Sequence, residues 1–527
     1  MDLVGCRHQA VPSRRRRKVA PARAQGPERS RDQSIAAKSV SPTANVGGQA
    51  MSDAIEQRMK SVLAAQKAAN IRVGAPSAEL RMERIERCIQ LLKKHQAAIV
   101  AALNADFGNR AEAVSGITDV AGSLGPLEYA KANLTKWMRP EKRKTTPALL
   151  GFLGAKAEVL YQPKGVVGII SPWNFPVNLT FAPLAGVLAA GNRAMIKPSE
   201  YAPATSLLMA EMFAEAFTEE EIACFPGGPE VGQAFAGLPF DHLIFTGATS
   251  IARHVMRAAA ANLTPLTLEL GGKSPVILGR SADYPTAAAR VMAGKTLNAG
   301  QICLAPDYVL APADKLDLFV SEAKTSVTSM FPSIKDNPDY TAVIADRHFE
   351  RIQGYIADAR AKGAEVVEIN PAGEDFSQQE HRKIPPTLII NPTDDMAVMQ
   401  EEIFGPVLPI KTYGKLAEAI DYVNAHERPL GLYYFGADAA EEAEVLSRTT
   451  SGGVTVNDVI FHVAQEDLPF GGVGPSGMGS YHGVDGFREF SHRKSVYKQL
   501  KKDLGPMKAL RPPYGEGVRK YLDSQLK

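Results

Sequence analysis

The sequence predicts an α/β protein built on parallel β-sheets, and three observations lead to this expectation. Short apolar segments typical of strands alternate with longer segments of helical periodicity from residue 157 onward. Gly165–Ile170 is a continuous apolar run, as expected for a strand that is covered on both faces of a parallel sheet. A length of 527 residues exceeds what one hydrophobic core usually serves, so two or three domains are expected.

Composition argues against several classes of protein. Apolar residues make up 45% of the chain and charged residues 22%, which is ordinary for a soluble globular protein. The longest apolar segment, Phe181–Ala190, is interrupted by Pro183 and is shorter than the roughly 18–20 residues that a membrane span needs. Four cysteines without paired spacing argue against a disulfide framework or a zinc site, and the ten histidines form no HExxH motif. We therefore expect a cytoplasmic protein without a metal and without a membrane anchor.

The first 50 residues differ in charge from the rest of the chain. They hold ten Lys and Arg against three acidic residues, a net charge of +7, which leaves −4 for residues 51–527 because the total is +3. They lack hydrophobic periodicity, so we expect a disordered extension. Its basic run, Arg14–Lys18, could alternatively bind nucleic acid or act in targeting. The capping pattern at Met51–Ala54 indicates that the folded part begins at Met51.

Helices are expected first, and strands and helices then alternate. Helical periodicity covers residues 53–105 and 112–138, and the basic segment Glu141–Pro147 is expected to be a connector. Strands are expected at Ala157–Tyr161, Gly165–Ile170, Ala194–Lys197, Asp241–Gly247, Leu266–Leu270, Pro275–Leu278, Tyr308–Leu310 and Thr387–Ile390.

Cys303 lies in a segment whose flanking residues mark a bent backbone, with Gly300 before it and Pro306 after it. One interpretation is a nucleophile whose thiolate meets a substrate in a cleft. The other is a small buried hydrophobic residue, the usual place of a free cysteine. The segment itself does not decide between them.

Glu269 lies near the end of an alternating apolar segment. Leu270 follows it, and Gly271 and Gly272 come next. This pattern predicts a strand that runs into a loop. A carboxylate there is either a salt-bridge partner or a general base whose pKa is raised by apolar surroundings. A cysteine nucleophile and a carboxylate base, each beside glycines, together suggest acyl-enzyme chemistry.

The loop Pro172–Pro176 follows a predicted strand and contains Asn174. The Asn174 side-chain amide could donate a hydrogen bond to a developing oxyanion. Alternatively, it could satisfy the backbone of a rigid structural turn. Together with Cys303 and Glu269, the loop favours the catalytic interpretation.

The segments Leu268–Pro275 and Gly300–Pro306 resemble the two active-site signatures of the aldehyde dehydrogenase superfamily, and the resemblance covers nearly all of residues 60–500. It implies a Rossmann-type NAD-binding domain, an α/β catalytic domain and an oligomerisation extension. The implied ranges are a disordered extension at 1–50, the NAD-binding domain with N-terminal helices at 51–270 and the catalytic domain at 271–452. Residues 453–527 would return to the NAD-binding domain and form the oligomerisation segment and the tail. The resemblance is expected to begin after Met51.

The resemblance also assigns roles to residues. Cys303 would attack the aldehyde, Glu269 would activate water, and Asn174 would help to hold the oxyanion. The cofactor-binding residues that it implies are Trp173, Lys197, Glu200, Gly247, Thr249, Ser250, Glu402 and Phe404.

NAD is favoured over NADP because the Glu200 carboxylate, placed with Lys197 at the adenosine ribose, would repel a 2′-phosphate. Glu402 would bind the nicotinamide ribose, and Phe404 would pack on the nicotinamide ring. After Gly247 the chain departs from the family pattern, because Ala248 and Ala252 replace a polar residue and a second glycine. Backbone amides and Thr249 or Ser250 would then hold the pyrophosphate.

A second glycine-rich segment, Gly472–Gly477, matches GxGxxG formally. Pro475 interrupts it and no βαβ unit follows, so we assign no cofactor to it. In the superfamily, this segment would be a structural loop.

Three further segments resemble the class 3 branch, whose members are mostly dimers: Gly300–Tyr308, Tyr481–Gly483 and Arg511–Tyr514. Pro172–Leu188 combined with His462–Gln465 most resembles coniferyl aldehyde dehydrogenases within that branch. The expected activity is therefore NAD-dependent oxidation of an aromatic aldehyde to a carboxylic acid, in a homodimer. A broad-specificity fatty or aliphatic aldehyde dehydrogenase is the alternative.

Two other functions stay open. A CoA-acylating relative would end in thiolysis, although Glu269 argues against it. A non-catalytic or nucleic-acid-binding protein would act through Arg14–Lys18, and Cys303, Glu269 and Asn174 would then have no role. We expect no nucleic-acid partner, since the body of the chain is mildly acidic.

Overall fold

The computed structural model describes residues 43–526. Residues 1–42, which were predicted to be disordered and which include the basic run Arg14–Lys18, lie outside the described residues. No helix within residues 43–526 is long and apolar enough to cross a membrane.

Helix α1 extends from Thr43 to Val73 and so begins upstream of Met51. The expectation that residues 43–50 are disordered is therefore wrong. Extending an existing helix costs little compared with nucleating one. The later turns of α1 supply that nucleus, because Met59 and Val62 are buried against the body of the protein.

Helices α2 (Ala78–Phe107), α3 (Glu112–Ser115) and α4 (Gly122–Trp137) follow, with a π-helical turn η1 (Gly116–Ala121) before α4. Ser77 caps α2 by accepting a hydrogen bond from the Leu80 N–H. The apolar positions expected on one face of α2 are buried: Ile85, Ile89, Leu92, Ile99 and Leu103. Cys88 is buried in the same core.

The first large sheet of the described chain has six strands, ordered β15-β7-β6-β3-β4-β5. Their bounds are β15 Gly477–Met478, β7 Leu266–Glu269, β6 His242–Thr246, β3 Val166–Ile170, β4 Arg193–Lys197 and β5 Ile222–Cys224. The strands from β7 to β5 pair in parallel, whereas β15 runs antiparallel to β7. The parallel α/β expectation is confirmed for this half.

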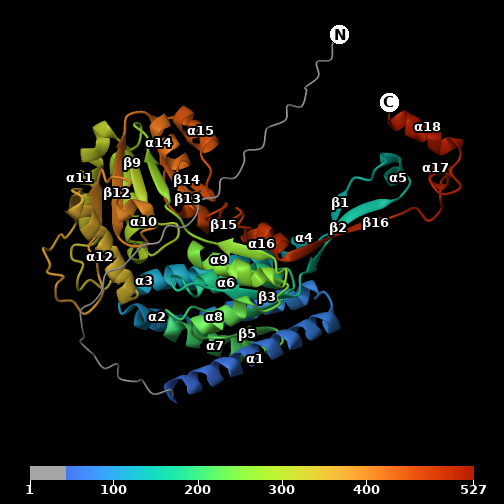
Figure 1. Ribbon diagram of the computed structural model, residues 1–527, viewed down its shortest axis with the longest axis horizontal. Helices are drawn as coiled ribbons and strands as arrows, with labels where there is room; N and C mark the ends of the chain where they lie inside the picture. The colour runs from blue at the N-terminus through green and yellow to red at the C-terminus, as the bar shows by residue number, and fades with distance from the viewer. Residues whose placement is uncertain (1–42, 527) are drawn as a thin grey trace, which may run out of the picture. The chain divides into compact units, whose positions relative to one another are not determined.

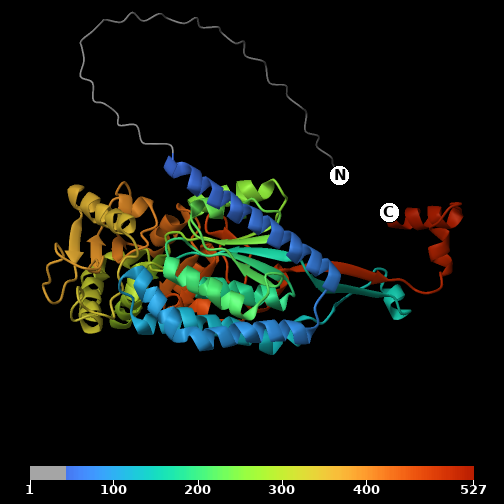
Figure 2. The ribbon, with the colours of Figure 1, turned by 90° about the horizontal axis from the view of Figure 1, so that it is seen from below.

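Helices cover both faces of this sheet (Figure 2). With α2 and α4, α6 (Asn178–Ala189) and α7 (Pro203–Ala216) form the core on one face. With α1, α8 (Pro229–Ala236) and α9 (Thr249–Ala260) form the core on the other. Alternate residues of β3 enter the two cores, since Val167 lies in the first and Val166 in the second.

The second large sheet of residues 43–526 has seven strands, ordered β10-β11-β12-β9-β8-β13-β14. Their bounds are β10 Glu365–Glu368, β11 Thr387–Ile390, β12 Val407–Tyr413, β9 Tyr308–Pro312, β8 Pro275–Leu278, β13 Gly431–Phe435 and β14 Gly453–Val456. The strands from β11 to β14 pair in parallel, and β10 is antiparallel to β11. The strands expected at Pro275–Leu278, Tyr308–Leu310 and Thr387–Ile390 are confirmed.

Helices also cover both faces of the second sheet (Figure 1). One core includes α10 (Tyr284–Thr296) and α11 (Leu316–Met330), and the other includes α12 (Asp346–Ala361), α14 (Leu416–Asn424) and α15 (Ala439–Arg448). Shorter elements are η2 Leu297–Gly300, η3 Ala313–Lys315, α13 Ala397–Gln400 and η4 Phe461–Ala464.

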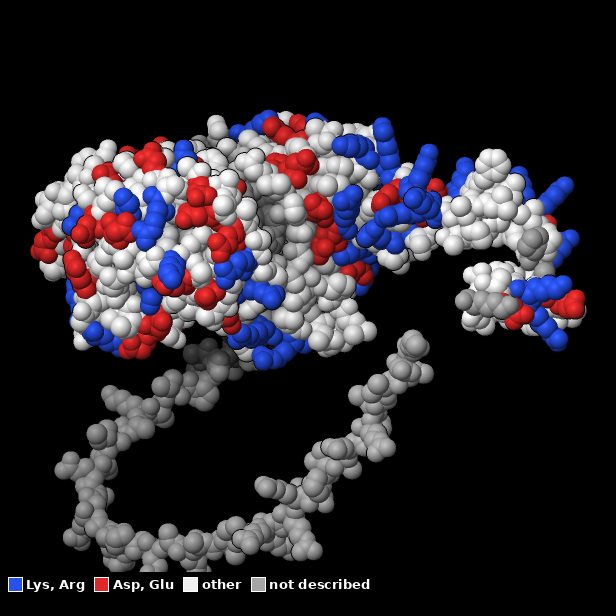
Figure 3. Space-filling view, turned by 90° about the horizontal axis from the view of Figure 1, so that it is seen from above, with Lys and Arg blue, Asp and Glu red and all other residues white. Residues whose placement is uncertain are grey.

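A third, three-stranded sheet joins β1 (Glu141–Arg143), β2 (Lys156–Pro163) and β16 (Ser491–Lys498) in antiparallel pairs. Figure 1 shows it extending away from the larger sheets, and Figure 3 shows Lys and Arg side chains gathered around it. The prediction that Glu141–Pro147 is only a connector is wrong for β1. Its pairing is made by backbone groups of β2, which side-chain periodicity does not reveal.

The remaining elements are α5 (Ala148–Phe152), α16 (Gly483–Glu489), α17 (Gly505–Ala509) and α18 (Glu516–Gln525). The predicted boundary after residue 452 falls just before β14, which still pairs with β13 in the seven-stranded sheet. The chain rejoins the six-stranded sheet later, at β15. Strand β14 is half-buried and lacks the fully apolar pattern of a central strand, so the sequence did not predict a strand there.

Candidate active site

Four strands of the six-stranded sheet bring predicted site residues to one edge. β3, β4, β6 and β7 pair in parallel, so their carboxyl ends lie along the same edge. The residues found there are Asn174 after β3, Lys197 at the end of β4, Gly247 after β6 and Glu269 at the end of β7. Open α/β sheets bind their ligands at this edge.

In the seven-stranded sheet, the amino ends of two strands lie toward these site residues. Cys303 precedes β9 and Glu402 precedes β12, which pairs with β9 in parallel. The Asn174 side-chain Nδ2 donates to the Gln301 carbonyl oxygen over 3.1 Å, so the two edges are in direct contact. The Glu402 carboxylate lies against Gly271, where an added Cβ would come within 2.3 Å of Glu402 Oε1.

The backbone before Cys303 is strained. Asn298, Ala299 and Gly300 are consecutive residues with φ of 49°, 52° and 72°. Such left-handed backbone costs about 1–3 kcal/mol for each non-glycine residue and persists only where the surroundings hold it. An added Cβ at Gly300 would lie 2.4 Å from the Gly405 carbonyl oxygen, so this position needs glycine for its space as well as its φ.

Gln301 holds this strained segment in place. Its Nε2 donates to the carbonyl oxygens of Asn298 over 2.9 Å and of Ala342 over 3.1 Å, and its Oε1 accepts from the Ile344 N–H over 3.1 Å. The side chain is fully buried. Cys303 therefore follows an anchored turn, which suits a group that must be held in one position.

The Cys303 thiol is half-buried and packs against the large apolar core of the first sheet. Burial raises the pKa of the thiol far above its usual range, and the Glu402 and Glu269 carboxyls raise it further. The backbone N–H groups of Cys303 and Leu304 oppose this shift. The thiol is therefore protonated at neutral pH, and its proton must be removed before it can attack a substrate.

Glu269 is 2% exposed, and neither carboxylate oxygen has a hydrogen-bond partner among residues 43–526. Burial raises the pKa of its carboxyl well above the usual range, and the backbone N–H of Gly472 opposes this only in part. A salt-bridge role is excluded within the described residues, because no ion pair involves this carboxylate. A carboxyl group with a raised pKa is a stronger base, once ionised, than an exposed one, which suits a group that takes a proton from water.

Asn174 is 3% exposed. Its side-chain amide carries two N–H donors, and the Gln301 carbonyl oxygen accepts from this nitrogen. A second donor is available to an oxygen bound beside Cys303, which lies two residues after Gln301.

The predicted cofactor residues Lys197 and Glu200 form a pair, with 3.2 Å between Lys197 Nζ and Glu200 Oε2. Lys197 is 2% exposed and also donates to the Pro198 carbonyl oxygen over 2.8 Å, whereas Glu200 is exposed. The pair thus presents a carboxylate outward at the ligand-binding edge of the sheet.

Gly247 links β6 to helix α9, and an added Cβ there would lie 2.7 Å from the Phe245 ring. Thr249 begins α9, but its hydroxyl donates to the Pro475 carbonyl oxygen over 3.1 Å. Ser250 is exposed. The structure therefore leaves Ser250 and the first backbone N–H groups of α9 as the better phosphate donors at this turn.

Glu402 and Phe404 lie in the turn before β12. The Phe404 ring packs edge-on against the Trp173 ring at 5.3 Å between centroids, so both predicted aromatic residues meet. Burial raises the pKa of the Glu402 carboxyl to about 8, and Asp307 adds to the shift. Its Oε1 has no hydrogen-bond partner within the described part of the chain.

Comparison with known proteins agrees with this geometry. The sequence profile of the aldehyde dehydrogenase family matches residues 29–496. The chain belongs to the aldehyde dehydrogenase family. This match starts before Met51, so the expectation that the resemblance begins only after Met51 is wrong.

This aldehyde dehydrogenase covers most of the length of three similar relatives. A probable coniferyl aldehyde dehydrogenase of Caulobacter vibrioides is 72% identical over 90% of this chain and 98% of the relative. The coniferyl aldehyde dehydrogenase of a Pseudomonas species is 54% identical over 88% of this chain and 96% of the relative. Family 3 member A2 of Rattus norvegicus is 38% identical over 83% of this chain and 87% of the relative.

Two solved structures share the fold. A substrate-bound aldehyde dehydrogenase of Staphylococcus aureus superposes with a TM-score of 0.82 at 34% identity, covering 89% of this chain and 99% of that one. A Mycobacterium tuberculosis aldehyde dehydrogenase complexed with NAD+ has a TM-score of 0.75 at 29% identity, covering 84% and 90%. The chain is accordingly an oxidoreductase that acts on aldehydes.

Several polar residues near the site of this aldehyde dehydrogenase were not predicted from the sequence. His348 packs on Trp173 at 5.1 Å between ring centroids, and its Nε2 has no partner among residues 43–526. Lys295 is fully buried, its Nζ is likewise unpaired in the described chain, and burial lowers its pKa to about 8. Lys295 lies within the amphipathic pattern of α10, where a lysine is normally exposed, so no sequence signal distinguished it.

Proposed function

We propose that this aldehyde dehydrogenase oxidises an aromatic aldehyde of the coniferyl aldehyde type to its carboxylic acid, with NAD as the oxidant. The observation that carries the proposal is the convergence of Cys303 and Glu269 from two different sheets, where the Glu269 carboxyl raises the pKa of the Cys303 thiol. The two relatives named for coniferyl aldehyde, at 72% and 54% identity, support the substrate class.

The reaction begins when Cys303 Sγ attacks the aldehyde carbon after losing its proton. The carbon–oxygen double bond opens, and the oxygen takes up negative charge. In this proposal, the Asn174 side-chain amide and the Cys303 backbone N–H donate to this oxygen. Donors aimed where charge develops commonly supply 100- to 1000-fold of rate, on the order of 3–4 kcal/mol.

The carbon–oxygen double bond then re-forms as the hydrogen on the former aldehyde carbon leaves as hydride, which bound NAD would accept, and a thioester remains on Cys303. The second half of the reaction is hydrolysis of this thioester. Glu269 takes a proton from water, and the resulting hydroxide adds to the acyl carbon. The carbon–sulfur bond then breaks, which releases the carboxylic acid and restores the thiol. The buried position of Glu269 supports this role, because a raised carboxyl pKa makes it a stronger base once it is ionised.

The residues present fit NAD. The exposed Glu200 carboxylate beside Lys197 can accept from ribose hydroxyls, Ser250 and the first turn of α9 can hold phosphate, and Glu402 offers an unpaired oxygen. NAD supplies the hydride acceptor when bound. The relative solved with NAD+ supports this assignment, and repulsion between Glu200 and a 2′-phosphate supports NAD over NADP.

We also infer a homodimer, built through the three-stranded sheet. Strand β16 is an edge strand of that sheet, and most of its residues are exposed. An unpaired exposed edge is a ready site for a second chain. Light scattering on the purified protein would test this, since a mass near that of one chain would contradict it.

The aldehyde panel is the test of the proposed function. Rates of NADH formation would be measured with coniferyl aldehyde, cinnamaldehyde, benzaldehyde and straight-chain aldehydes, each with and without CoA. We expect the aromatic propenals to have the highest kcat/KM and CoA to have no effect. A preference for straight-chain aldehydes would favour the broad aliphatic alternative, and an acyl-CoA product would overturn the hydrolytic step.

A further inference from the structure

A second group of polar side chains, with His482 buried and His462 and Glu466 half-buried, lies beside the proposed active site. The segment that contains η4 carries His462 and Glu466, and His482 lies just before α16. Three of their atoms are buried without a hydrogen-bond partner in the part of the chain that the structure describes: His462 Nε2, Glu466 Oε2 and His482 Nδ1. Leaving a buried polar atom unpaired is unfavourable, so three in one cluster require an explanation.

Aromatic rings hold this cluster together. The Phe470 ring stacks on His482 at 5.0 Å between centroids and lies 6.2 Å from His462. Tyr481 packs against both Phe470, at 5.8 Å, and His482, at 5.2 Å. The polar atoms are therefore set among aromatic rings, which are suitable neighbours for another aromatic ring.

The cluster is close to the reacting groups. Phe470, Tyr481 and Cys303 belong to one packed core. Burial raises the pKa of the Tyr481 hydroxyl, and the charges of Glu269, Cys303 and Glu466 raise it further. Tyr481 is thus near Glu466 as well as near the reacting groups Cys303 and Glu269.

Glu466 has space and support at this position. An added Cβ at Gly125 of α4 would lie 3.3 Å from Glu466 Oε1, so the absent side chain leaves room for the carboxyl. The next residue, Asp467, accepts a 2.8 Å hydrogen bond from the Tyr129 hydroxyl, which fixes the segment to α4. Neighbouring residues Phe461 and Gln465 are exposed, so the cluster lies directly beneath the surface.

The chemistry of the cluster suits a hydroxyl group. Burial raises the pKa of the Glu466 carboxyl to about 7, so it can donate or accept a hydrogen bond near neutral pH. Burial lowers the imidazole pKa of His462 to about 4, and that of His482 to about 4 with the charge of His462 contributing, so both rings are neutral. Thr455 Oγ1 lies 2.8 Å from His462 Nδ1, which leaves Nε2 for a further partner.

We propose that His462, Glu466 and His482 form a subsite for the phenolic hydroxyl of a 4-hydroxyaryl aldehyde whose carbonyl carbon reacts at Cys303. This rests on the proposed function, because it assumes an aromatic aldehyde bound at Cys303. A phenol both donates and accepts, so it can satisfy the buried atoms that an unsubstituted ring or an alkyl chain leaves unpaired. A site built to pair with a hydroxyl discriminates strongly against the analogue that lacks it.

The test compares 4-hydroxycinnamaldehyde with cinnamaldehyde, which differ by this hydroxyl alone. We expect the full-length enzyme to favour the hydroxylated substrate by tenfold or more in kcat/KM. Glu466→Leu should reduce that ratio about tenfold by lowering kcat/KM for the hydroxylated aldehyde alone, and Glu466→Gln should keep most of it. Asp467→Asn is the matched control and should leave the ratio unchanged.

His482→Phe provides a second variant, because it keeps the stacking on Phe470 while removing the ring nitrogens. We expect the same selective loss, even if Glu466→Leu fails to fold. Equal rates with the two aldehydes in the unmodified enzyme, or equal losses for both in the variants, would overturn the subsite and leave the proposed function intact. Failure of the unmodified enzyme to oxidise either aldehyde would instead overturn the proposed function.

Discussion

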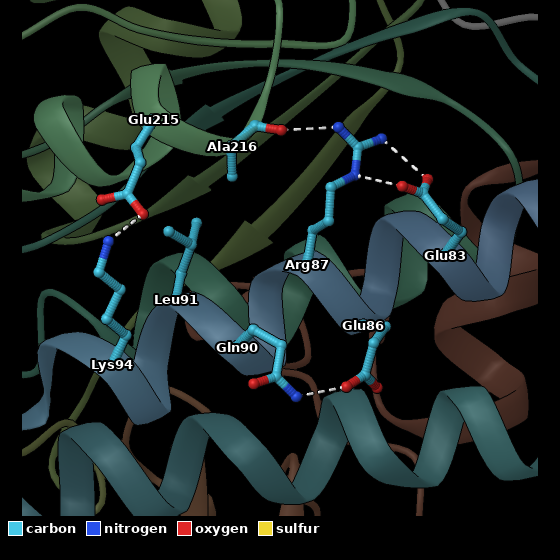
Figure 4. Close-up of a pocket in the computed structure, with 8 residues that line it drawn as sticks. All are labelled: Glu83, Glu86, Arg87, Gln90, Leu91, Lys94, Glu215 and Ala216. Atoms are coloured by element: carbon cyan, nitrogen blue, oxygen red, sulfur yellow. Dashed lines mark hydrogen bonds and ion pairs between the residues drawn. The ribbon is translucent and has the colours of Figure 1, made fainter.

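Two regions of this enzyme gather charged side chains, and they differ in whether those charges are paired. A surface depression of about 430 Å³ between α2 and the end of α7 is lined by charged residues (Figure 4). Arg87 bonds to Glu83 and to the Ala216 carbonyl oxygen, and Lys94 bonds to Glu215. Gln90 donates to Glu86. The charged groups drawn there satisfy one another and leave little for a ligand to do.

The proposed active site shows the opposite pattern. Buried Glu269 and Lys295 and half-buried Glu402 lie at the junction of the two large sheets, and each has an atom without a partner in residues 43–526. Maintaining such groups lowers stability, so their presence points to function. A buried polar group without a hydrogen-bond partner is therefore better evidence of a functional site than a surface depression whose charged residues are paired with one another.

The largest effect is expected at the nucleophile. Cys303→Ala should abolish NADH formation while leaving the melting temperature almost unchanged, because the thiol forms no ion pair with any residue that the structure describes. Steady-state assays and thermal unfolding would measure both. Cys224→Ala, at another half-buried cysteine, is the control and should retain activity. Substantial turnover in Cys303→Ala would refute the assignment of the nucleophile.

Glu200 resembles the residues of the surface depression in being paired, here with Lys197. It is nevertheless exposed at the edge of the sheet where the cofactor is proposed to bind. Glu200→Gln should raise the ratio of kcat/KM for NADP to that for NAD about fivefold to tenfold, because it removes repulsion of a 2′-phosphate. The control Glu211→Gln, on the exposed face of α7, should not change the ratio. An unchanged ratio in Glu200→Gln would show that this carboxylate does not select the cofactor.

The unsatisfied carboxyl of Glu269 should also appear in the pH dependence of stability. Its pKa in the folded protein lies above the ordinary 4.5, so its favourable contribution is complete below 4.5 and is lost as pH rises toward the folded pKa. Glu269→Gln should therefore gain melting temperature relative to the parent enzyme as pH rises above 4.5 toward the folded pKa of Glu269. A difference that is constant with pH, or that shrinks as pH rises, would contradict the raised pKa.

The smallest effect is expected in the surface depression. Lys94→Ala removes an ion pair whose partners are both well exposed, and such pairs add little to stability. Activity and melting temperature should match the parent enzyme within error. A severalfold loss of kcat/KM would show that the depression and the active site are coupled.

The sequence predicted the parallel α/β architecture because buried strands such as β8 and β11 are short apolar runs with clear ends. It also singled out Cys303 and Glu269, because scarce cysteine and a carboxylate beside glycines are visible without coordinates. The three-stranded sheet was missed because β1 and β16 are charged and exposed. Their pairing depends on backbone contacts between distant parts of the chain.

Other features of the site depend on the tertiary structure. Asn298 and Ala299 adopt left-handed backbone although neither is glycine, and only packing around Gln301 explains this. Lys295 and Glu466 look like ordinary charged residues in the sequence, and their burial follows from how the two sheets and the η4 segment meet. Burial of a charge is a property of neighbours that lie far along the chain.

The most direct test of the account is the pre-steady-state kinetics of Glu269→Gln with an aromatic aldehyde and NAD. Cys303 should still form the thioester, while its hydrolysis should slow strongly. We predict a burst of about one NADH per active site followed by a low steady rate. Intact-mass analysis should show the acyl group on the enzyme, and peptide mapping should place it on Cys303. A steady rate equal to that of the parent enzyme, with no burst and no covalent adduct, would contradict the division of roles between Cys303 and Glu269.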